Sequence, residues 1–241
     1  MKIERRFEIK DRTLLGFGGE AESGKSTACD YLISKGWHEL SFARNLKEMC
    51  IKGFGLTSEQ VYDQAFKNEE FRYGPIQLDV NHLRFIQDWI MFKTDEVGVD
   101  YFGFKKSLLR YIINSDKKIL FRTPREVLQF VGTEICRKCY SETYHIDVVL
   151  NEIQEITKKD KSSICISDAR FINEREFVTS LGGLNIHIFD VNKEKKASVG
   201  IEGHDSENEI MKGNYDFVIE NDKTEGKDAL FKKLEEILVS I

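Results

Sequence analysis

Residues 18–27 read Gly18-Gly19-Glu20-Ala21-Glu22-Ser23-Gly24-Lys25-Ser26-Thr27, and residues 19–26 fit the pattern G-x-x-x-x-G-K-[ST] without a mismatch. The apolar stretch 13–17 before this run suits a buried strand, and residues 27–33 after it carry apolar side chains at helical spacing. A strand, a glycine turn and a helix start surround an anion with backbone N–H groups and the positive helix end. The sequence therefore predicts a nucleotide phosphate site rather than a glycine-rich turn that merely caps a helix.

Within this loop two side chains have expected roles. Lys25 reaches the outer phosphates, and the hydroxyl of Ser26 completes a Mg²⁺ shell that is shared with phosphate oxygens. The predicted nucleotide-binding residues are Gly19, Ala21, Glu22, Ser23, Gly24, Lys25, Ser26 and Thr27.

Length and charge restrict the class of protein. With 241 residues, the chain can bury one good core, and we expect a single α/β domain over residues 1–241 with an insertion. The formal net charge of −5 argues against a broad nucleic-acid-binding face. No apolar run approaches the roughly 20 residues of a membrane span, and the first six residues lack the apolar core of a signal peptide. We expect a soluble, cytoplasmic protein without a nucleic-acid or membrane partner.

The cysteines also indicate a reducing compartment, because the chain has five, an odd number. Cys136 and Cys139 form a C-x-x-C with His145 close by, which raises the alternative of a zinc site. A second ligand pair at similar spacing is missing, so we prefer two partly buried thiols on one helix face.

Elsewhere the chain alternates between strand and helix patterns. We expect strands at 37–42, 163–167, 184–189 and 217–219, and helices at about 43–53, 124–140, 143–158 and 227–239. Residues 78–92 and 104–113 have helical periodicity inside a block, about 57–120, that we interpret as a helical insertion on the substrate side. These patterns predict a three-layer α/β fold of the P-loop NTPase type with a mostly parallel sheet. Ligands of such a sheet lie beyond the carboxyl ends of its strands.

The predicted helix 124–140 begins with Thr123 as N-cap and Pro124 at its first position. Its polar residues at four-residue spacing form one slowly winding stripe, composed of Arg125, Gln129, Thr133 and Arg137. An amide can pair with a base edge and a guanidinium with phosphate, and Gly132 lacks a side chain where a ligand could approach. A solvated helix face explains the same spacing, and both interpretations stay open.

Directly after the apolar strand 163–167 comes Asp168-Ala169-Arg170. An Asp at a strand's carboxyl end can hold Mg²⁺ through water, and an Arg two residues later can neutralise a transferring phosphoryl group. The rival interpretation is an ion pair that braces the loop. A phosphate loop on the neighbouring strand favours the functional one.

Three further basic residues, Lys47, Lys67 and Arg72, lie in or beside the expected insertion and could meet an acceptor phosphate. A phosphate monoester acceptor already carries an anionic oxygen, so phosphoryl transfer to it needs alignment and charge neutralisation and no dedicated base. The residues of this chain suit that reaction.

The chain resembles the deoxynucleoside monophosphate kinases of bacteriophages in a series of motifs. They are the phosphate loop, Ser41-Phe42-Ala43, the run from Thr123 to Glu134 (P-R-x-x-L-Q-x-x-G-T-E), Asp168 to Glu174 (D-x-R-F-x-N-E) and His204-Asp205-Ser206-Glu207. The resemblance implies a single P-loop kinase domain of the nucleoside-monophosphate-kinase type that uses ATP and Mg²⁺ to phosphorylate deoxynucleoside monophosphates.

By this likeness Gln129, Gly132 and Thr133 line the acceptor pocket, and Asp168 and Arg170 face the phosphates. His145 occupies a pocket position where relatives often have Trp, and residues 190–192 replace an Arg-Pro pair. Two other functions are weighed against this one: a P-loop kinase for another small metabolite such as dephospho-coenzyme A, and an NTP-hydrolysing module that drives a partner. A homodimer is compatible with the sequence.

Overall fold

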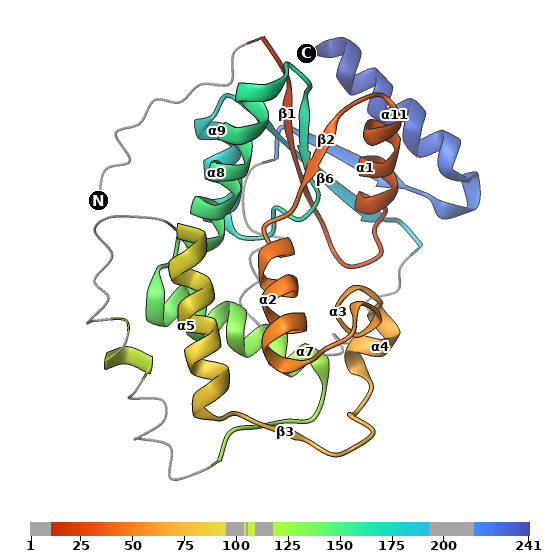
Figure 1. The fold of residues 1–241 in the computed structure, drawn as a ribbon. Helices are drawn as coiled ribbons and strands as arrows, with labels where there is room; N and C mark the ends of the chain where they lie inside the picture. Colours follow the sequence, from red (N-terminus) through yellow and green to blue (C-terminus); the bar gives the residue numbers. More distant parts are fainter. Residues whose placement is uncertain (1–10, 95–103, 105, 109–117, 193–214) are drawn as a thin grey trace. The chain divides into compact units, whose positions relative to one another are not determined.

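Five parallel strands form the sheet of the part of the chain that carries the phosphate loop (Figure 1). The computed structural model describes residues 11–94, 104, 106–108, 118–192 and 215–241. The strand order is β2-β5-β1-β6-β7. The strands are β1 (Leu14–Gly18), β2 (His38–Leu40), β5 (Ile164–Ile166), β6 (Leu184–Asp190) and β7 (Phe217–Asn221).

The pairing of β1 with its two neighbours decides which residues lie together at the carboxyl edge of this sheet. Leu14 pairs with Ile164 on one side of β1, and Gly18 pairs with His187 on the other. The N–H of Ala169 donates to the carbonyl of Phe17 at 3.0 Å, which ties the segment after β5 to the end of β1. The phosphate loop and the residues that follow β5 therefore share one edge, as predicted for a parallel sheet.

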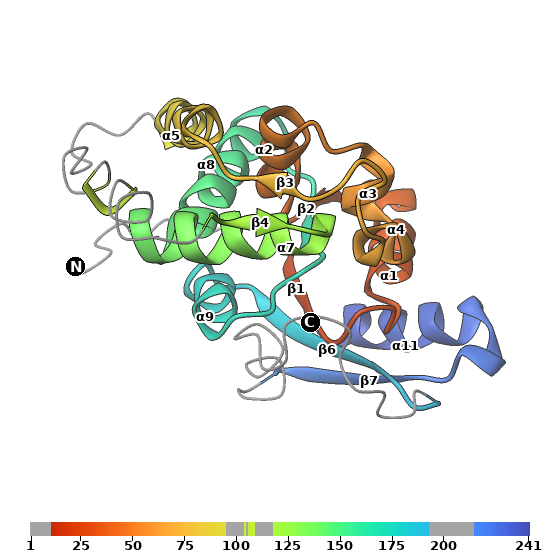
Figure 2. The ribbon, with the colours of Figure 1, turned by 90° about the horizontal axis from the view of Figure 1, so that it is seen from below.

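Helices cover both faces of the sheet. α1 (Lys25–Ser34) and α11 (Lys227–Ser240) pack together on one face, and α9 (Ile172–Ser180) and the end of α8 (Tyr144–Lys159) lie on the other (Figure 2). The spacing of apolar residues explains how α1 and α11 pack. Each helix places two of them four residues apart, and all four are fully or nearly buried: Ala28 and Leu32 in α1, and Leu230 and Leu234 in α11. The predicted three-layer α/β fold is confirmed.

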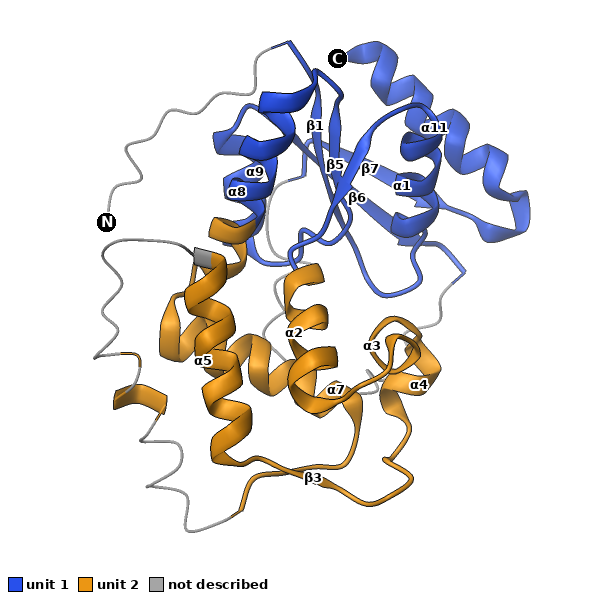
Figure 3. Ribbon diagram, viewed as in Figure 1, with its two compact units in different colours: residues 1–42, 149–241 blue, residues 43–148 orange. Residues whose placement is uncertain are grey.

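The chain divides into two compact units, residues 1–42 with 149–241 and residues 43–148 (Figure 3). The second unit is mainly helical around its own apolar core, and the expected insertion, 57–120, lies inside it. Its short antiparallel pair is β3 (Ile76–Gln77) with β4 (Leu120–Phe121). Helices of this unit include α2 (Arg44–Phe54), α3 (Ser58–Tyr62), α4 (Gln64–Asn68), α5 (Val80–Thr94), α7 (Pro124–Gln129) and the π-helix η1 (Phe130–Tyr140).

The predicted helix 124–140 is continuous, but it changes from an α-helix to a π-helix along its length. Thr123 caps it as expected, since its side chain accepts from the N–H of Glu126 at 3.3 Å. Beyond Gln129 the helix has the wider π turn, and it ends with the N–H of Ser141 donating to the carbonyl of Cys136 five residues back. The polar residues of the predicted stripe are spaced by four, which is more than the 3.6 residues of an α turn and less than a full π turn. The stripe therefore winds around the helix in one direction before Gln129 and in the opposite direction after it. Long π segments are rare, and apolar spacing does not reveal them.

The sequence also missed some elements. α9 was not expected, nor were the two short helices α3 and α4, each of five residues. Of the predicted helix 104–113, residues 104 and 106–108 are described and helical. The motif His204-Asp205-Ser206-Glu207 lies outside the described residues.

Candidate active site

The phosphate loop has a backbone that requires glycine at two positions. Gly19 has φ +135°, and a Cβ there would lie 2.1 Å from the carbonyl oxygen of Ile188. Gly24 has φ +110° and is the N-cap of α1. Both values lie in the region that side chains disfavour. The two glycines therefore let the loop curl into a tight cradle whose main chain packs against Ile188 of β6.

Lys25 lies in this cradle and is 7% exposed. Its Nζ donates to the carbonyl of Gly19 at 2.8 Å and to that of Glu20. The hydroxyl of Ser23 is 3.4 Å from the same nitrogen. A compact ammonium at the loop is the point charge that outer phosphates need.

A residue far along the chain also holds the loop. Asn221, the last residue of β7, donates from Nδ2 to the carbonyl of Ser23 at 2.9 Å. Sequence reasoning did not find this contact, since nothing in residues 217–221 marks a partner for the loop.

Asp168 is bound to the end of β2. Its Oδ2 accepts from the hydroxyl of Ser41 and its Oδ1 from the N–H of Phe42, both at 2.8 Å. The carboxylate lies at the carboxyl edge of the sheet, and carboxylate oxygens can take part in a magnesium shell. Ser26, in the first turn of α1, is an exposed residue. Carboxylate and hydroxyl oxygens are ligands that suit Mg²⁺, so these two residues fit the predicted metal.

The main chain of Arg170 is fixed from both sides. Glu174, 3% exposed, accepts from the N–H groups of Arg170 and Phe171 at 2.9 and 3.0 Å. Arg175 donates from Nη1 to the carbonyl of Arg170 at 2.7 Å. Among the described residues, the buried Nε of Arg170 has no hydrogen-bond partner. The D-x-R-F-x-N-E run thus fixes the main chain of Arg170, whose side chain keeps a buried Nε–H without a partner among the described residues.

His187 lies next to the loop on β6, stacked on Tyr215 with ring centroids 4.7 Å apart. Burial, with help from the positive charges of Lys25 and Arg175, lowers the pKa of His187 below its ordinary value. The neutral ring therefore adds no charge beside Lys25 near neutral pH.

Gln129, in the second unit, has a half-buried side chain whose Oε1 is buried and has no hydrogen-bond partner among the described residues. An unsatisfied buried carbonyl is costly, so this oxygen is an acceptor that a bound ligand could use. A Cβ on Gly132 would lie 2.7 Å from Cδ2 of Leu46 on α2, so helix packing also accounts for a glycine at this position. Its predicted place at the acceptor site stays a prediction.

Arg125 is held by α4. Its Nε donates to Oδ1 of Asn68 at 2.6 Å and its Nη2 to Oε1 of Gln64 at 3.1 Å. Both acceptors are neutral side-chain amides on α4, and they orient the guanidinium. Sequence reasoning named Arg125 but neither amide.

The other predicted acceptor residues also belong to the second unit. Lys47 lies over the ring of Tyr62, with 4.3 Å from Nζ to the centroid. His145 is buried, and its Nε2 is 3.4 Å from the carbonyl of Gly132. Lys67, Thr133 and Arg137 are half-buried, and Arg72 is exposed. The phosphate loop, Asp168 and Arg170 therefore belong to the first unit, and the predicted acceptor residues belong to the second.

The family model of deoxynucleotide monophosphate kinases matches residues 13–233. The chain belongs to this family. It is therefore a nucleotide monophosphate kinase, a phosphotransferase, as the resemblance implied.

Two relatives agree with the family. A protein of Acanthamoeba polyphaga mimivirus, provisionally named deoxynucleotide monophosphate kinase, is 27% identical over 223 residues, which cover 88% of this chain and 89% of the relative. The deoxynucleoside-5'-monophosphate kinase of Escherichia phage T5 is 28% identical over 198 residues, with 74% and 76% covered. Among solved structures, dephospho-CoA kinase from Campylobacter jejuni matches with a TM-score of 0.43 and 15% identity over 93% of this chain and 96% of its own.

Other predicted features of this kinase are placed as follows. Cys136 is buried and Cys139 half-buried on the π-helix, and the described residues contain no group of three or more His, Cys, Asp or Glu that could hold a metal ion. Burial raises the pKa of Cys139 to about 11. No helix in the described ranges is long and apolar enough to span a membrane.

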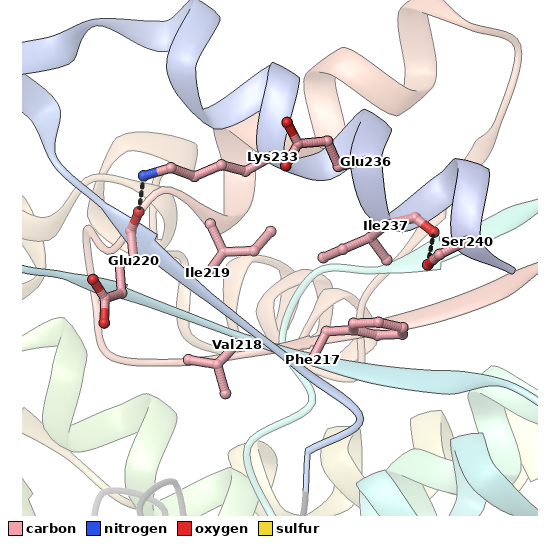
Figure 4. A pocket seen from close by; sticks show the side chains of 8 residues that line it. All are labelled: Phe217, Val218, Ile219, Glu220, Lys233, Glu236, Ile237 and Ser240. Carbon is pink, nitrogen blue, oxygen red and sulfur yellow. Dashed lines mark hydrogen bonds between the residues drawn. The ribbon is translucent and has the colours of Figure 1, made fainter.

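A pocket of about 440 Å³ lies between β7 and α11 and is separate from these residues (Figure 4). Its walls include Phe217, Val218 and Ile237, and Lys233 donates to the carbonyl of Glu220 at 2.7 Å on its rim. None of the predicted site residues lines it.

Proposed function

We propose that this kinase transfers the γ-phosphoryl group of ATP to a deoxynucleoside monophosphate and so forms the diphosphate. The observation that carries the proposal is the phosphate loop, with Lys25 seated against the carbonyls of Gly19 and Glu20, in a chain of this family. The loop N–H groups and Lys25 bind and align the donor phosphates.

Charge neutralisation is the second requirement. Mg²⁺, when bound, draws charge from the phosphate oxygens, and Ser26 and Asp168 are the residues that would hold it. The planar guanidinium of Arg170 neutralises charge on the equatorial oxygens of the transferring group, and its buried Nε–H is a donor for this purpose.

Acceptor recognition falls to the second unit. The buried Oε1 of Gln129 accepts a hydrogen bond from the edge of the base, beside Thr133 and Gly132. Arg125, oriented by Gln64 and Asn68, contacts the acceptor phosphate. Lys47, Lys67, Arg72 and Arg137 supply further positive charge, and His145 contacts the helix through the carbonyl of Gly132.

The acceptor's phosphate oxygen is already anionic, so no side chain has to remove a proton before attack. This explains why alignment and charge suffice. The five cysteines are free thiols, which fits the cytoplasm, where ATP and Mg²⁺ are also available.

An ADP-release assay with all common deoxynucleoside and ribonucleoside monophosphates and with dephospho-coenzyme A tests the proposal, and Lys25→Ala serves as the inactive control. We expect release with at least one deoxynucleoside monophosphate and little with dephospho-coenzyme A. ADP release that needs no acceptor, or that responds to DNA alone, contradicts it.

A further inference from the structure

Asn221, on the edge strand β7, connects this strand to the phosphate loop through a hydrogen bond. It is 6% exposed, and its Nδ2 lies 2.9 Å from the carbonyl oxygen of Ser23, which is itself 1% exposed. The carbonyl of Asn221 in turn accepts from the N–H of Val191 at 3.3 Å, so the donor belongs to an anchored main chain. A hydrogen bond inside such a dry region has a set direction and is costly to lose.

This contact orients the peptide group between Ser23 and Gly24. A trans peptide is planar, and its C=O and N–H point in opposite directions. When Asn221 holds the carbonyl of Ser23, the N–H of Gly24 faces the side of the loop away from Asn221. That N–H is one of the donors at the start of α1 that a bound phosphate would use.

Gly24 fits closely against the same amide. A Cβ on Gly24 would lie 2.5 Å from Nδ2 of Asn221, and the φ of Gly24 is +110°. The glycine of the loop therefore makes room for the Asn221 side chain as well as for the turn. The G-K-S end of the loop and Asn221 form one packed unit although 198 residues separate the bonded pair.

We propose that Asn221 is a positioning residue for the donor nucleotide: it orients the Gly24 N–H toward the phosphates of ATP. The inference rests on the proposed function only in taking ATP as the donor. Asn221 itself touches the loop and not the substrate.

The test compares Asn221→Leu with wild type by calorimetric titration of ATP with Mg²⁺. Leu keeps the branched shape of Asn but removes the donor, so the Ser23 carbonyl loses its partner. We expect the Kd for ATP to rise about tenfold, the effect of one buried hydrogen bond. If Asn221→Leu does not fold, Asn221→Ser is titrated in its place, because its shorter side chain also removes the contact.

Asn185→Leu is the matched control. Asn185 is 2% exposed, and its Nδ2 donates to the carbonyl of Arg175 at 3.1 Å and to Thr179 at 3.0 Å. It lies near the start of β6, away from the carboxyl edge of the sheet. Its substitution should lower the Tm as much as that of Asn221 does, while the Kd for ATP stays within about twofold of wild type.

An unchanged Kd in the Asn221 variant overturns the proposal, and so does an equal loss of ATP affinity in Asn185→Leu, which would indicate a general effect of stability. The titration contains no acceptor. A wild type that binds ATP but phosphorylates no deoxynucleoside monophosphate therefore refutes the proposed function and leaves the test of Asn221 valid.

Discussion

The hydroxyl of Ser41 donates to Oδ2 of Asp168 at 2.8 Å, and the next residue, Phe42, donates its N–H to the other carboxylate oxygen. The motif that starts at Ser41 and the motif that starts at Asp168 therefore meet in one small hydrogen-bonded group. One carboxylate braces the end of β2 and also belongs to the predicted magnesium site. The two roles can be separated by substitution.

Asp168→Asn keeps the brace and removes the charge, because Asn Oδ1 can accept from Phe42 and the Ser41 hydroxyl can rotate to accept from the amide. Ser41→Ala removes one bracing bond and keeps the charge. We expect Asp168→Asn to lower kcat by at least about tenfold and raise the Mg²⁺ requirement with little change in Tm. Ser41→Ala should lower stability by about 1 kcal/mol with a nearly normal Mg²⁺ titration.

Kinetics over a range of Mg²⁺ concentrations and thermal melts of both variants check this prediction. Coincident Mg²⁺ curves for Asp168→Asn and wild type, together with a lowered Tm, would show that Asp168 only braces the loop.

For Arg170→Lys we expect kcat to fall on the order of a hundredfold while binding of ATP weakens much less. Lys keeps the charge but lacks the planar fork and the buried Nε–H that has no partner among the described residues. The main chain at this position is held through Glu174 and Arg175, so the substitution should leave the loop in place. Steady-state kinetics with both substrates check the split. A normal kcat with a lowered Tm means that Arg170 is structural.

How far the sequence predicts this site depends on the distance along the chain between the partners. Residues 18–27 contain the whole loop pattern, and the apolar runs beside them suffice for β1 and α1, so these were predicted correctly. Short-range spacing also gave the Thr123 cap. The contact between Asn221 and Ser23 joins residues 198 positions apart and depends on the strand order, which no local pattern contains.

Other features were missed because local signals mislead. α9 has few apolar residues, and they form only a weak stripe. Glu174 and Arg175 look like solvated charges in the sequence, but both are buried, and their hydrogen bonds to main-chain groups compensate for the loss of water. The π turn beyond Gln129 shares its apolar spacing with an ordinary helix. The packing role of Gly132 against Leu46 also depends on a contact between two helices, which no local pattern contains.

Gly132→Ala tests this packing in a double-mutant cycle with Leu46→Ala. The added Cβ would lie 2.7 Å from Cδ2 of Leu46, so the end of the Leu46 side chain has to shift, at a packing cost of about 1 kcal/mol. With Leu46 shortened, the clash disappears and the better helix former should be neutral or stabilising. We expect a coupling of about 1 kcal/mol in the free energies of unfolding. Additive effects, together with a raised acceptor KM for Gly132→Ala alone, would instead favour the ligand explanation.

Stability should fall as the pH drops from 7.5 to 5.5, and His187 should account for part of the loss. The folded chain lowers the pKa of His187 below the ordinary value of 6.5. Below that value the unfolded chain takes up a proton that the folded chain resists, so the free energy of unfolding decreases. Tyr215 and Phe189 pack on the ring, and Lys25 and Arg175 face it with positive charge, partly offset by Glu20.

Carboxylates with lowered pKa values, such as Asp160 at about 2, stay ionised over this range. Melting curves of wild type and His187→Gln at pH 7.5, 6.5 and 5.5 check the prediction. The variant should lose less stability toward pH 5.5, and an identical loss in both proteins would assign the effect to other groups.

Gln129→Leu should separate function from stability most clearly. The substitution removes a buried carbonyl that has no hydrogen-bond partner in the described part of the chain, so the Tm should stay the same or rise. If that carbonyl reads the base, the acceptor KM should rise about tenfold or the base preference should change, while the KM for ATP stays nearly constant. Both KM values and the Tm are measured for each acceptor that the wild type phosphorylates. A more stable protein with unchanged acceptor kinetics would mean that Gln129 belongs only to a solvated helix face, whereas a loss of affinity for ATP as well would place its effect outside the acceptor site.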